Sequence, residues 1–305
     1  MSFSVTILGS GSAVPTSSRN PTSQHIECNG RYFLIDCGEG TQMQIRKLGL
    51  KLQRIDRIFI SHLHGDHYFG LVGLLSTMHM MGRTKPVNVY GPLGLKDIVE
   101  IQLQAAGSRL AFTVNVIEHE PESSGVLYED AKHVVRYFPL SHKIPTSGFL
   151  ISQKERERVL NVEKARADKV RIEYYHQLKK SQDVIDEKGQ TISYMEYTSE
   201  PPISRSYAFC SDTRYHVPII EFIKGADILY HEATFTDKLL DRAKTTRHST
   251  ASQAALIASK AEVGQLLMGH LSARYDNGDQ HEFEAKPIFE NSRYVNDGEV
   301  INIEA

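Results

Sequence analysis

The chain has 305 residues, of which 40% are hydrophobic and 24% are charged, and its formal net charge is −2. This composition is ordinary for a globular protein with a large core, either one domain with an insertion or two smaller domains. The near-neutral charge excludes a general attraction to nucleic acid, so such a partner would have to be held by local basic patches.

Neither a membrane segment nor a disulfide framework is visible in the sequence. No window approaches the roughly eighteen consecutive apolar residues that a membrane helix needs. The start, MSFSVTILGSGS, lacks the basic flank and the long apolar stretch of a signal peptide. Cys28, Cys37 and Cys210 are odd in number and widely spaced, which favours buried reduced thiols. We therefore expect a cytoplasmic protein without membrane contact.

Short β-rich runs alternate with helical patterns along most of the chain. The first are the strand-like runs FSVTILG (3–9), HIECNG (25–30) and YFLIDCG (32–38), then the helical run TQMQIRKLG (41–49) and the strand RIFI (57–60). Further helices are predicted at residues 68–81, 95–106, 217–223 and 250–261, and further strands at 87–90, 112–117, 134–138, 149–152, 207–210, 228–231 and 265–268. This alternation indicates a layered α/β fold.

One segment departs from the alternation. Residues 154–180 contain nine Lys or Arg against five Asp or Glu, and DEKGQT (186–191) is typical of a turn between two short strands. The segment has too little apolar content to belong to a core. We interpret residues 153–202 as an arm inserted into a single domain that spans residues 1–305. A solvated pair of surface helices is the alternative for such a charge run.

The stretch SHLHGDHYFG (61–70) follows a strand-like run and contains the pattern HxHxDH, formed by His62, His64, Asp66 and His67. Imidazole and carboxylate groups bind divalent transition metals, and a loop that leaves a strand end can turn all four side chains inward. A single loop histidine is more often a surface residue. Four ligand types within six positions indicate a metal site instead.

Further ligands are needed, because four residues cannot fill two metal shells. His142 follows VVRYFPLS, Asp212 follows SYAFCS and His270 follows GQLLMG, so each lies one or two residues beyond a strand-like run. A polar residue at a strand end is commonplace. Together with the cluster, however, these three complete two sites.

HxHxDH followed by a histidine, an aspartate and a histidine after later strands resembles the metallo-β-lactamase superfamily. The resemblance implies an αβ/βα four-layer sandwich, with two sheets back to back, helices outside and a dinuclear metal site at one edge. The implied ligands are His62, His64 and His142 for one metal, Asp66, His67 and His270 for the other, and Asp212 as the bridge. Asp36, in FLIDCGEG, would hold the ligand loops in place. It could equally be an ordinary acidic strand end.

Finer motifs narrow the resemblance. SDTR, HEATF, HSTASQAA and HLSARY occur in this order and, with HKIPTSGFLI and IDCGEGTQMQ, are similar to the ribonuclease Z family. That family implies a zinc-dependent endonuclease that removes the 3′ trailer from precursor tRNA and leaves a 3′-hydroxyl. Two zinc ions per subunit would generate a hydroxide at neutral pH and neutralise the attacking and leaving oxygens of the phosphodiester.

The resemblance also implies catalytic roles for three residues. His248, in TTRHSTA, would be the general acid that protonates the leaving 3′ oxygen, and Glu232 of HEATF would keep it protonated. Asp66 would accept a proton as well as bind metal. From the residues alone, His248 is equally consistent with a helix cap or a solvent contact.

RNA contacts are implied at two places. The arm lies where the family inserts its exosite, and QLKKSQDVIDEKGQTI, with Lys179 and Lys180, resembles the second half of that arm. The Gly-Pro pair expected near residues 173–176 is missing. We expect the arm to grip tRNA through positive charge. By analogy with the family we also expect a homodimer, in which the arm of one subunit serves the site of the other.

The second place is the loop PTSSRN, which matches the family pattern PxKxRN at Arg19 and Asn20 but has Ser17 in place of the lysine. Arg274 in SARY is a further candidate for phosphate contact. Both arginines could also be plain surface residues.

Two other functions stay open. A small-molecule phosphodiesterase or lactonase of the same superfamily would need no arm, and cleavage of precursor tRNA would separate it from a nuclease. A non-catalytic RNA-binding subunit is disfavoured by the intact ligand set.

Overall fold

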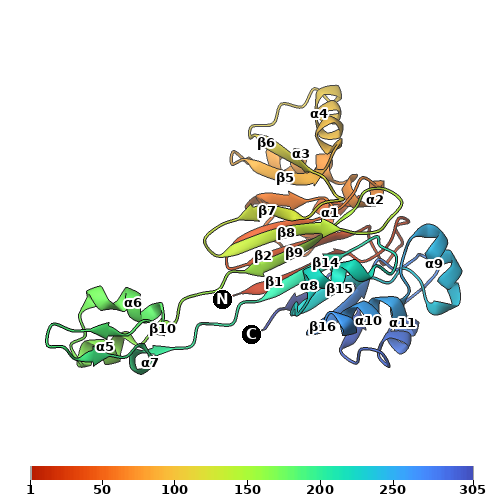
Figure 1. Ribbon diagram of the computed structural model, residues 1–305. Coiled ribbons are helices and arrows are strands. Elements are labelled where there is room, and N and C mark those ends of the chain that lie inside the picture. Colours follow the sequence, from red (N-terminus) through yellow and green to blue (C-terminus); the bar gives the residue numbers. More distant parts are fainter. Residues whose placement is uncertain (1, 305) are drawn as a thin grey trace.

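The computed structural model describes residues 2–304, which form two seven-stranded β-sheets packed face to face with helices outside (Figure 1). In order across the sheet, the first sheet contains β18 (Val300–Asn302), β1 (Phe3–Gly9), β2 (Ser23–Cys28), β3 (Arg31–Ile35), β4 (Arg57–Phe59), β5 (Val87–Pro92) and β6 (Val114–His119). The second contains β17 (Ser292–Tyr294), β16 (Gln265–Gly269), β15 (Ile228–Glu232), β14 (Ser206–Cys210), β9 (Ser147–Gln153), β8 (His133–Pro139) and β7 (Gly125–Glu129).

Each sheet has a parallel half and an antiparallel half. Strands β3 to β6 run parallel in the first sheet, as do β14 to β17 in the second. The remaining neighbours pair antiparallel. Since β8 and β14 both pair antiparallel with β9, they point the same way, and their carboxyl ends reach the same edge of the sheet.

Helices cover the outer face of each sheet. Those of the first sheet are α1 (Thr41–Lys47), α2 (Gly65–Tyr68), α3 (Leu71–Met80) and α4 (Leu95–Ala105), with the 3₁₀ turn η1 (Leu52–Arg54). Those of the second half are η3 (Val217–Ile219), α8 (Ile220–Ile223), η4 (Asp237–Leu239), α9 (Leu240–Thr246), α10 (Ala251–Lys260) and α11 (Asp279–Ala285).

Three apolar layers hold the sandwich together. The central layer lies between the sheets, where Phe59 of β4 packs on Phe149 of β9, with ring centroids 5.8 Å apart. The outer layers fill the space between each sheet and its helices. Because the inner strands are buried on both faces, they form continuous apolar runs without alternation, as in residues 266–268 of β16. The predicted four-layer αβ/βα fold is confirmed.

Several elements differ from the sequence-based expectation. The helix predicted at 68–81 is interrupted between α2 and α3, where a side chain on Gly70 would come within 2.1 Å of the Gly38 carbonyl oxygen. The helix predicted at 217–223 begins as a 3₁₀ turn with proline near its start. Outside the arm, the elements that were not predicted include β7, α9, α11, β17 and β18. Most are short or solvent-facing, so their apolar pattern is weak.

The segment between β9 and β14 leaves the sandwich on two extended stretches and folds at a distance from it (Figure 1). Its elements are β10 (Val159–Leu160), α5 (Val162–Ala167), η2 (Ile172–Tyr174), α6 (Tyr175–Lys179), β11 (Val184–Ile185), β12 (Thr191–Ile192), α7 (Tyr194–Tyr197) and β13 (Thr198–Ser199). A small apolar cluster that includes Ala165, Leu178 and Tyr197 holds them together. We call this segment, residues 153–202, the arm.

The arm is not basic as a whole. Between residues 153 and 202 there are ten Lys or Arg and ten Asp or Glu, because the part beyond residue 180 adds five acids and only one lysine. Several of the basic groups also form ion pairs, such as Arg158 with Glu200 and Lys164 with Glu196. The positive excess seen in residues 154–180 is therefore cancelled over the complete arm.

The cysteines and the length of the helices bear on two expectations from the sequence. All three cysteines are free and buried, as predicted. Within residues 2–304, no helix combines the length and the apolar character needed to span a membrane.

Candidate active site

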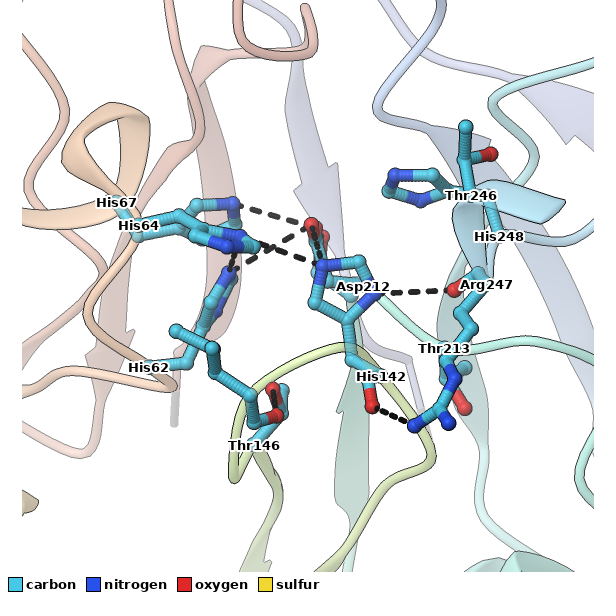
Figure 2. Close-up of polar contacts among 12 residues, drawn as sticks. His62, His64, His67, His142, Thr146, Asp212, Thr213, Thr246, Arg247 and His248 are labelled. Carbon is cyan, nitrogen blue, oxygen red and sulfur yellow. Dashed lines mark hydrogen bonds and ion pairs between the residues drawn. The ribbon is translucent and has the colours of Figure 1, made fainter.

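Seven candidate ligands from both sheets meet at one edge of the sandwich. Figure 2 shows His62, His64, His67, His142 and Asp212 of this group. The loop after β4 and the short α2 carry His62, His64, Asp66 and His67, and the other three residues follow β8, β14 and β16. Asp212 and His270 have φ of 57° and 58°. This left-handed backbone is uncommon for residues other than glycine, and it turns each side chain inward directly beyond its strand.

The ligands form two groups around Asp212. Its Oδ2 lies 3.6 Å from Nε2 of His62 and 3.4 Å from Nε2 of His142. Its Oδ1 lies 3.2 Å from Nε2 of His67 and 3.0 Å from Nε2 of His270. His64 joins the first group and Asp66 the second, and the candidate ligand atoms within each group lie within 4.8 Å of one another. The structure thus brings together the residues of the two sets that the resemblance implied, and a third group combines Asp212 and His270 with His248.

The cluster fits divalent cations. Nε2 of His67 and Nε2 of His270 are buried without a hydrogen-bond partner, and both point at the Asp212 carboxylate group. Nε2 of His62 lies 3.0 Å from Nδ1 of His64, although two unprotonated nitrogens would repel each other. Burying these groups without a cation would be costly, and nitrogen and carboxylate donors are typical ligands of zinc, manganese and iron.

The second nitrogen of each buried histidine is held by a neighbour, which orients the ring. Nδ1 of His67 lies 2.7 Å from the carboxylate of Asp36, which also accepts hydrogen bonds from the Ser61 amide and hydroxyl. Nδ1 of His62 lies 3.0 Å from the Ser61 hydroxyl. Asp36 is fully buried, with φ of 55°, so it does more than end a strand. These contacts direct both Nε2 atoms toward the cluster.

Two neighbours of the cluster were not found from the sequence. The backbone carbonyl of Arg247 lies 3.0 Å from Nδ1 of His142, and its guanidinium donates to the His142 carbonyl at 2.6 Å (Figure 2). The Thr234 hydroxyl lies 2.9 Å from Nδ1 of His270. Arg247 precedes His248 in TTRHSTA, but nothing in that stretch indicates a contact with His142. Thr234 is part of HEATF, so that motif could have drawn attention to it.

His248 lies beside the cluster and is tied to a buried carboxylate. Its Nδ1 is 2.7 Å from Oε1 of Glu232, and its ring centroid lies 5.4 Å from that of His270. Burial lowers the pKa of His248, but the charge and hydrogen bond of Glu232 outweigh burial and raise it to about 9. Burial likewise favours neutral Glu232, yet His248 holds the pKa of Glu232 below its usual range. The pair is therefore an imidazolium and a carboxylate at neutral pH.

An open cavity of about 720 Å³ gives access to the cluster. Asp66, His142, His248 and His270 line it, together with residues 12–14 and 272–274. It therefore joins the candidate ligands and the imidazolium of His248 in one space that a substrate can enter.

The candidate RNA contacts are spread over three regions. Arg274 lines the cavity and donates to the Ser272 hydroxyl at 2.8 Å. Lys179 and Lys180 lie on the arm at the end of α6, and Lys179 forms an ion pair with Glu157. They do not approach the cavity (Figure 1).

Arg19 and Asn20 lie behind the cavity wall. Arg19 is only 4% exposed, and its guanidinium donates to the backbone carbonyls of Tyr275 and Asp276. A phosphate contact from Arg19 would first require these bonds to break. The Asn20 amides donate to the carboxylate of Asp297, which also accepts from the Ser10 amide and hydroxyl. Both side chains thus fix loops beside the site.

The fold and the site define a hydrolase of the metallo-β-lactamase superfamily. The family model "Anti-Pycsar protein Apyc1" matches residues 3–154. Human tRNase Z, short form (ELAC1), superposes with a TM-score of 0.71 at 29% identity, over 99% of this chain and 100% of that one. YhfI from Bacillus subtilis, a metallo-β-lactamase fold protein, superposes with a TM-score of 0.69 at 18% identity over 99% of this chain and 100% of its own.

Whole-length relatives identify the family. Ribonuclease Z of Bacteroides fragilis (strain YCH46) is 42% identical over 292 residues, which cover 95% of each chain. Ribonuclease Z of Cytophaga hutchinsonii is 43% identical over 299 residues, which cover 98% of this chain and 95% of that relative. The chain belongs to the ribonuclease Z family, and the resemblance noted in the sequence is confirmed.

Proposed function

We propose that this protein is the endoribonuclease that removes the 3′ trailer from precursor tRNA and leaves a 3′-hydroxyl on the tRNA. One observation carries the proposal: an imidazolium, His248, lies beside a dinuclear set of ligands in the same open cavity. Family membership supports RNA as the substrate, since the relatives are named ribonuclease Z. Precursor tRNA as substrate also agrees with the expected cytoplasmic location.

Two zinc ions per subunit are part of the proposal. His62, His64 and His142 would hold one ion, and Asp66, His67 and His270 the other, with Asp212 between them. Bound there, the ions would supply a nucleophile at neutral pH and neutralise the charge of the phosphodiester. Zinc is preferred because histidine-rich sites of this kind suit it well. Measurement of the metal content of the purified protein tests both the identity and the number of ions.

Side chains of the protein would accept a proton from the attacking water and donate one to the leaving 3′ oxygen. The Asp66 carboxylate lines the cavity, where it can accept a proton from the attacking water. His248 carries its transferable proton on Nε2, because Nδ1 donates to Glu232. That proton can pass to the leaving 3′ oxygen. Glu232 would hold the ring in this orientation, and it is itself held by the amides of Thr213 and Ser249.

We further propose that the arm grips the tRNA away from the cleavage point. Its distance from the cavity and its own apolar cluster support a separate binding role. Since the arm is neutral overall, the grip would depend on individual exposed cations such as Lys180. Lys179 would have to exchange its ion pair with Glu157 for a phosphate.

A homodimer is proposed by analogy with the family, and apolar side chains that are exposed on neighbouring helices support it. Met43 on α1, Met80 on α3 and Ile101 on α4 are 71%, 76% and 64% exposed, and Phe69, just before α3, is 65% exposed. A second copy of the chain would cover such side chains. Sedimentation of the wild type and of a Met80→Glu, Ile101→Glu variant tests this, because a stable dimer should dissociate when charges enter its interface.

Cleavage of a precursor tRNA by the wild type and three altered proteins tests the main proposal. The wild type should release the trailer and leave a 3′-hydroxyl. His248→Ala should lose at least about a hundredfold in kcat, which is typical for removal of a general acid. A control, His216→Ala, removes a histidine that lies outside the cavity and should retain the wild-type rate. Deletion of the arm should reduce kcat/KM for precursor tRNA far more than for a nitrophenyl phosphodiester. A loss that is equal for both substrates would contradict the arm proposal.

The alternative function is a small-molecule phosphodiesterase or lactonase of the same superfamily, which would need no arm; the Anti-Pycsar Apyc1 family model matches residues 3–154 only. That match ends where the arm begins. An enzyme that cleaves cyclic nucleotides but leaves precursor tRNA intact would support this alternative over the proposed function.

A further inference from the structure

Two free cations stand at the rim of the catalytic cavity. Lys143 and Arg242 line it with Arg274, and both are exposed. Among residues 2–304, no group lies within hydrogen-bond or ion-pair distance of either charged end. The only acids that line the cavity are Asp66 and Asp212, which belong to the proposed metal ligands. With those acids committed to metal, the rim keeps an excess of positive charge.

Both cations belong to the side of the cavity that carries His248. Lys143 follows His142 directly, and the ring of His142 lies 4.9 Å from that of His248. Arg242 lies one turn before Thr246 on α9, which leads into His248, and Thr246 also lines the cavity. The hydrogen bond from the Arg247 guanidinium to the His142 carbonyl joins the two elements. The backbone positions of both cations are thus tied to that of the proposed general acid.

The loop PTSSRN, which the sequence analysis linked to RNA contact, supplies no free cation to the cavity. Ser17 stands where the family pattern has lysine, and the donors of Arg19 bind backbone carbonyls. A substrate phosphate entering the cavity would therefore meet Lys143 and Arg242, whose donors are free, before it met the motif loop.

We propose that Lys143 and Arg242 bind the phosphates of the tRNA 3′ end, on the side of the scissile bond that retains the 3′-hydroxyl. This inference rests on the proposed function. His248 would protonate the leaving 3′ oxygen, and that oxygen belongs to the last nucleotide of the tRNA. The side of the cavity that holds His248 therefore faces the tRNA nucleotides and not the trailer. Lys143 lies in HKIPTSGFLI, one of the stretches that are similar to the family, whereas Arg242 belongs to none of the motifs identified in the sequence.

Kinetics of three variants test the proposal. Lys143→Ala and Arg242→Ala should each lower kcat/KM for precursor tRNA by about tenfold, the usual effect of one charge-assisted hydrogen bond. The salt dependence of binding should fall by about 0.7 per lost contact to single-stranded RNA. Lys244→Ala, on the same helix but outside the cavity, is the matched control and should behave like wild type. Metal content and melting temperature show whether each variant is folded.

Substrates with one neutral methylphosphonate linkage locate the contact. If the linkage just before the cut is neutral, the two variants should lose no further activity relative to wild type, whereas a neutral linkage in the trailer should leave the tenfold difference intact. The opposite pattern would overturn the assignment to the tRNA side. If Lys143→Ala and Arg242→Ala keep the same kcat/KM as Lys244→Ala on every substrate, neither residue contacts a substrate phosphate, and the proposal is refuted. A wild type that leaves all precursor tRNA uncut would instead refute the proposed function, and this inference with it.

Discussion

Replacement of Glu232 by glutamine should shift the pH range in which the enzyme works. Glu232 holds the pKa of His248 at about 9, against an ordinary value of 6.5. The glutamine side chain keeps the size of glutamate but loses the charge, so burial becomes the main influence and lowers the pKa of His248 to 6.5 or below. A raised pKa keeps His248 protonated until the pH approaches 9, and the variant should lose its proton donor above about pH 6.5.

The size of this effect follows from the two pKa values. At pH 8, His248 would be about 90% protonated in the wild type and about 3% in Glu232→Gln, which predicts at least about a 30-fold loss of kcat. At pH 6 the loss should be much smaller than at pH 8, and below about twofold if the pKa falls only to 6.5. Single-turnover cleavage of precursor tRNA between about pH 6 and pH 9 measures both, because product release then does not limit the rate.

Glu118→Gln is the matched control. Glu118 also accepts two backbone hydrogen bonds, from the Gly94 and Lys96 amides, but it lies outside the catalytic cavity. Its pH profile should follow that of the wild type. A Glu232→Gln variant that loses the same factor at pH 6 and pH 8 would refute the electrostatic reasoning, and would show that Glu232 acts only by positioning the loops it binds.

Three further predictions concern metal binding and stability. Asp36→Asn should weaken metal binding by about 10- to 100-fold in a chelator competition, because the carboxylate no longer orients His67; unchanged affinity would mean that Ser61 suffices. Phe209→Ala should reduce the free energy of unfolding by about 3–5 kcal/mol in urea titrations, since Phe209 stacks on Tyr230 between the sheets with centroids 5.2 Å apart. A reduction below about 1 kcal/mol would show that the core closes around the gap. Removal of metal by a chelator should abolish cleavage and lower the melting temperature, because bound metal stabilises only the folded state. A melting temperature that is independent of added zinc would contradict a metal site in this cluster.

The candidate ligands could be predicted from the sequence because each lies just beyond an apolar strand, and strands of one direction end at the same edge of a sheet. HxHxDH supplied the anchor, and His142, Asp212 and His270 followed from their places after β8, β14 and β16. The pattern does not reveal the backbone conformation that directs these side chains toward one another. Asp212 and His270 have a left-handed φ, but neither is a glycine, which is the residue that usually indicates this conformation in a sequence.

The direction of long side chains could not be predicted either. Arg19 matches an RNA-binding motif, yet its guanidinium turns inward to backbone carbonyls, while Arg242, which matches no motif, points into the cavity. A sequence pattern records the residue type and the spacing but not the rotamer, and arginine has several of similar energy. The charge of the arm was misjudged for a simpler reason: the window ended before the acids beyond residue 180.

The contacts of Asp297 link the folding of an N-terminal loop to the synthesis of the C-terminal part of the chain. It binds Ser10 and Asn20, at the two ends of a loop that borders the cavity, while β18 completes the sheet beside β1. A ribosome must therefore have translated the chain beyond residue 297 before the earliest part of the nuclease can settle into its working shape.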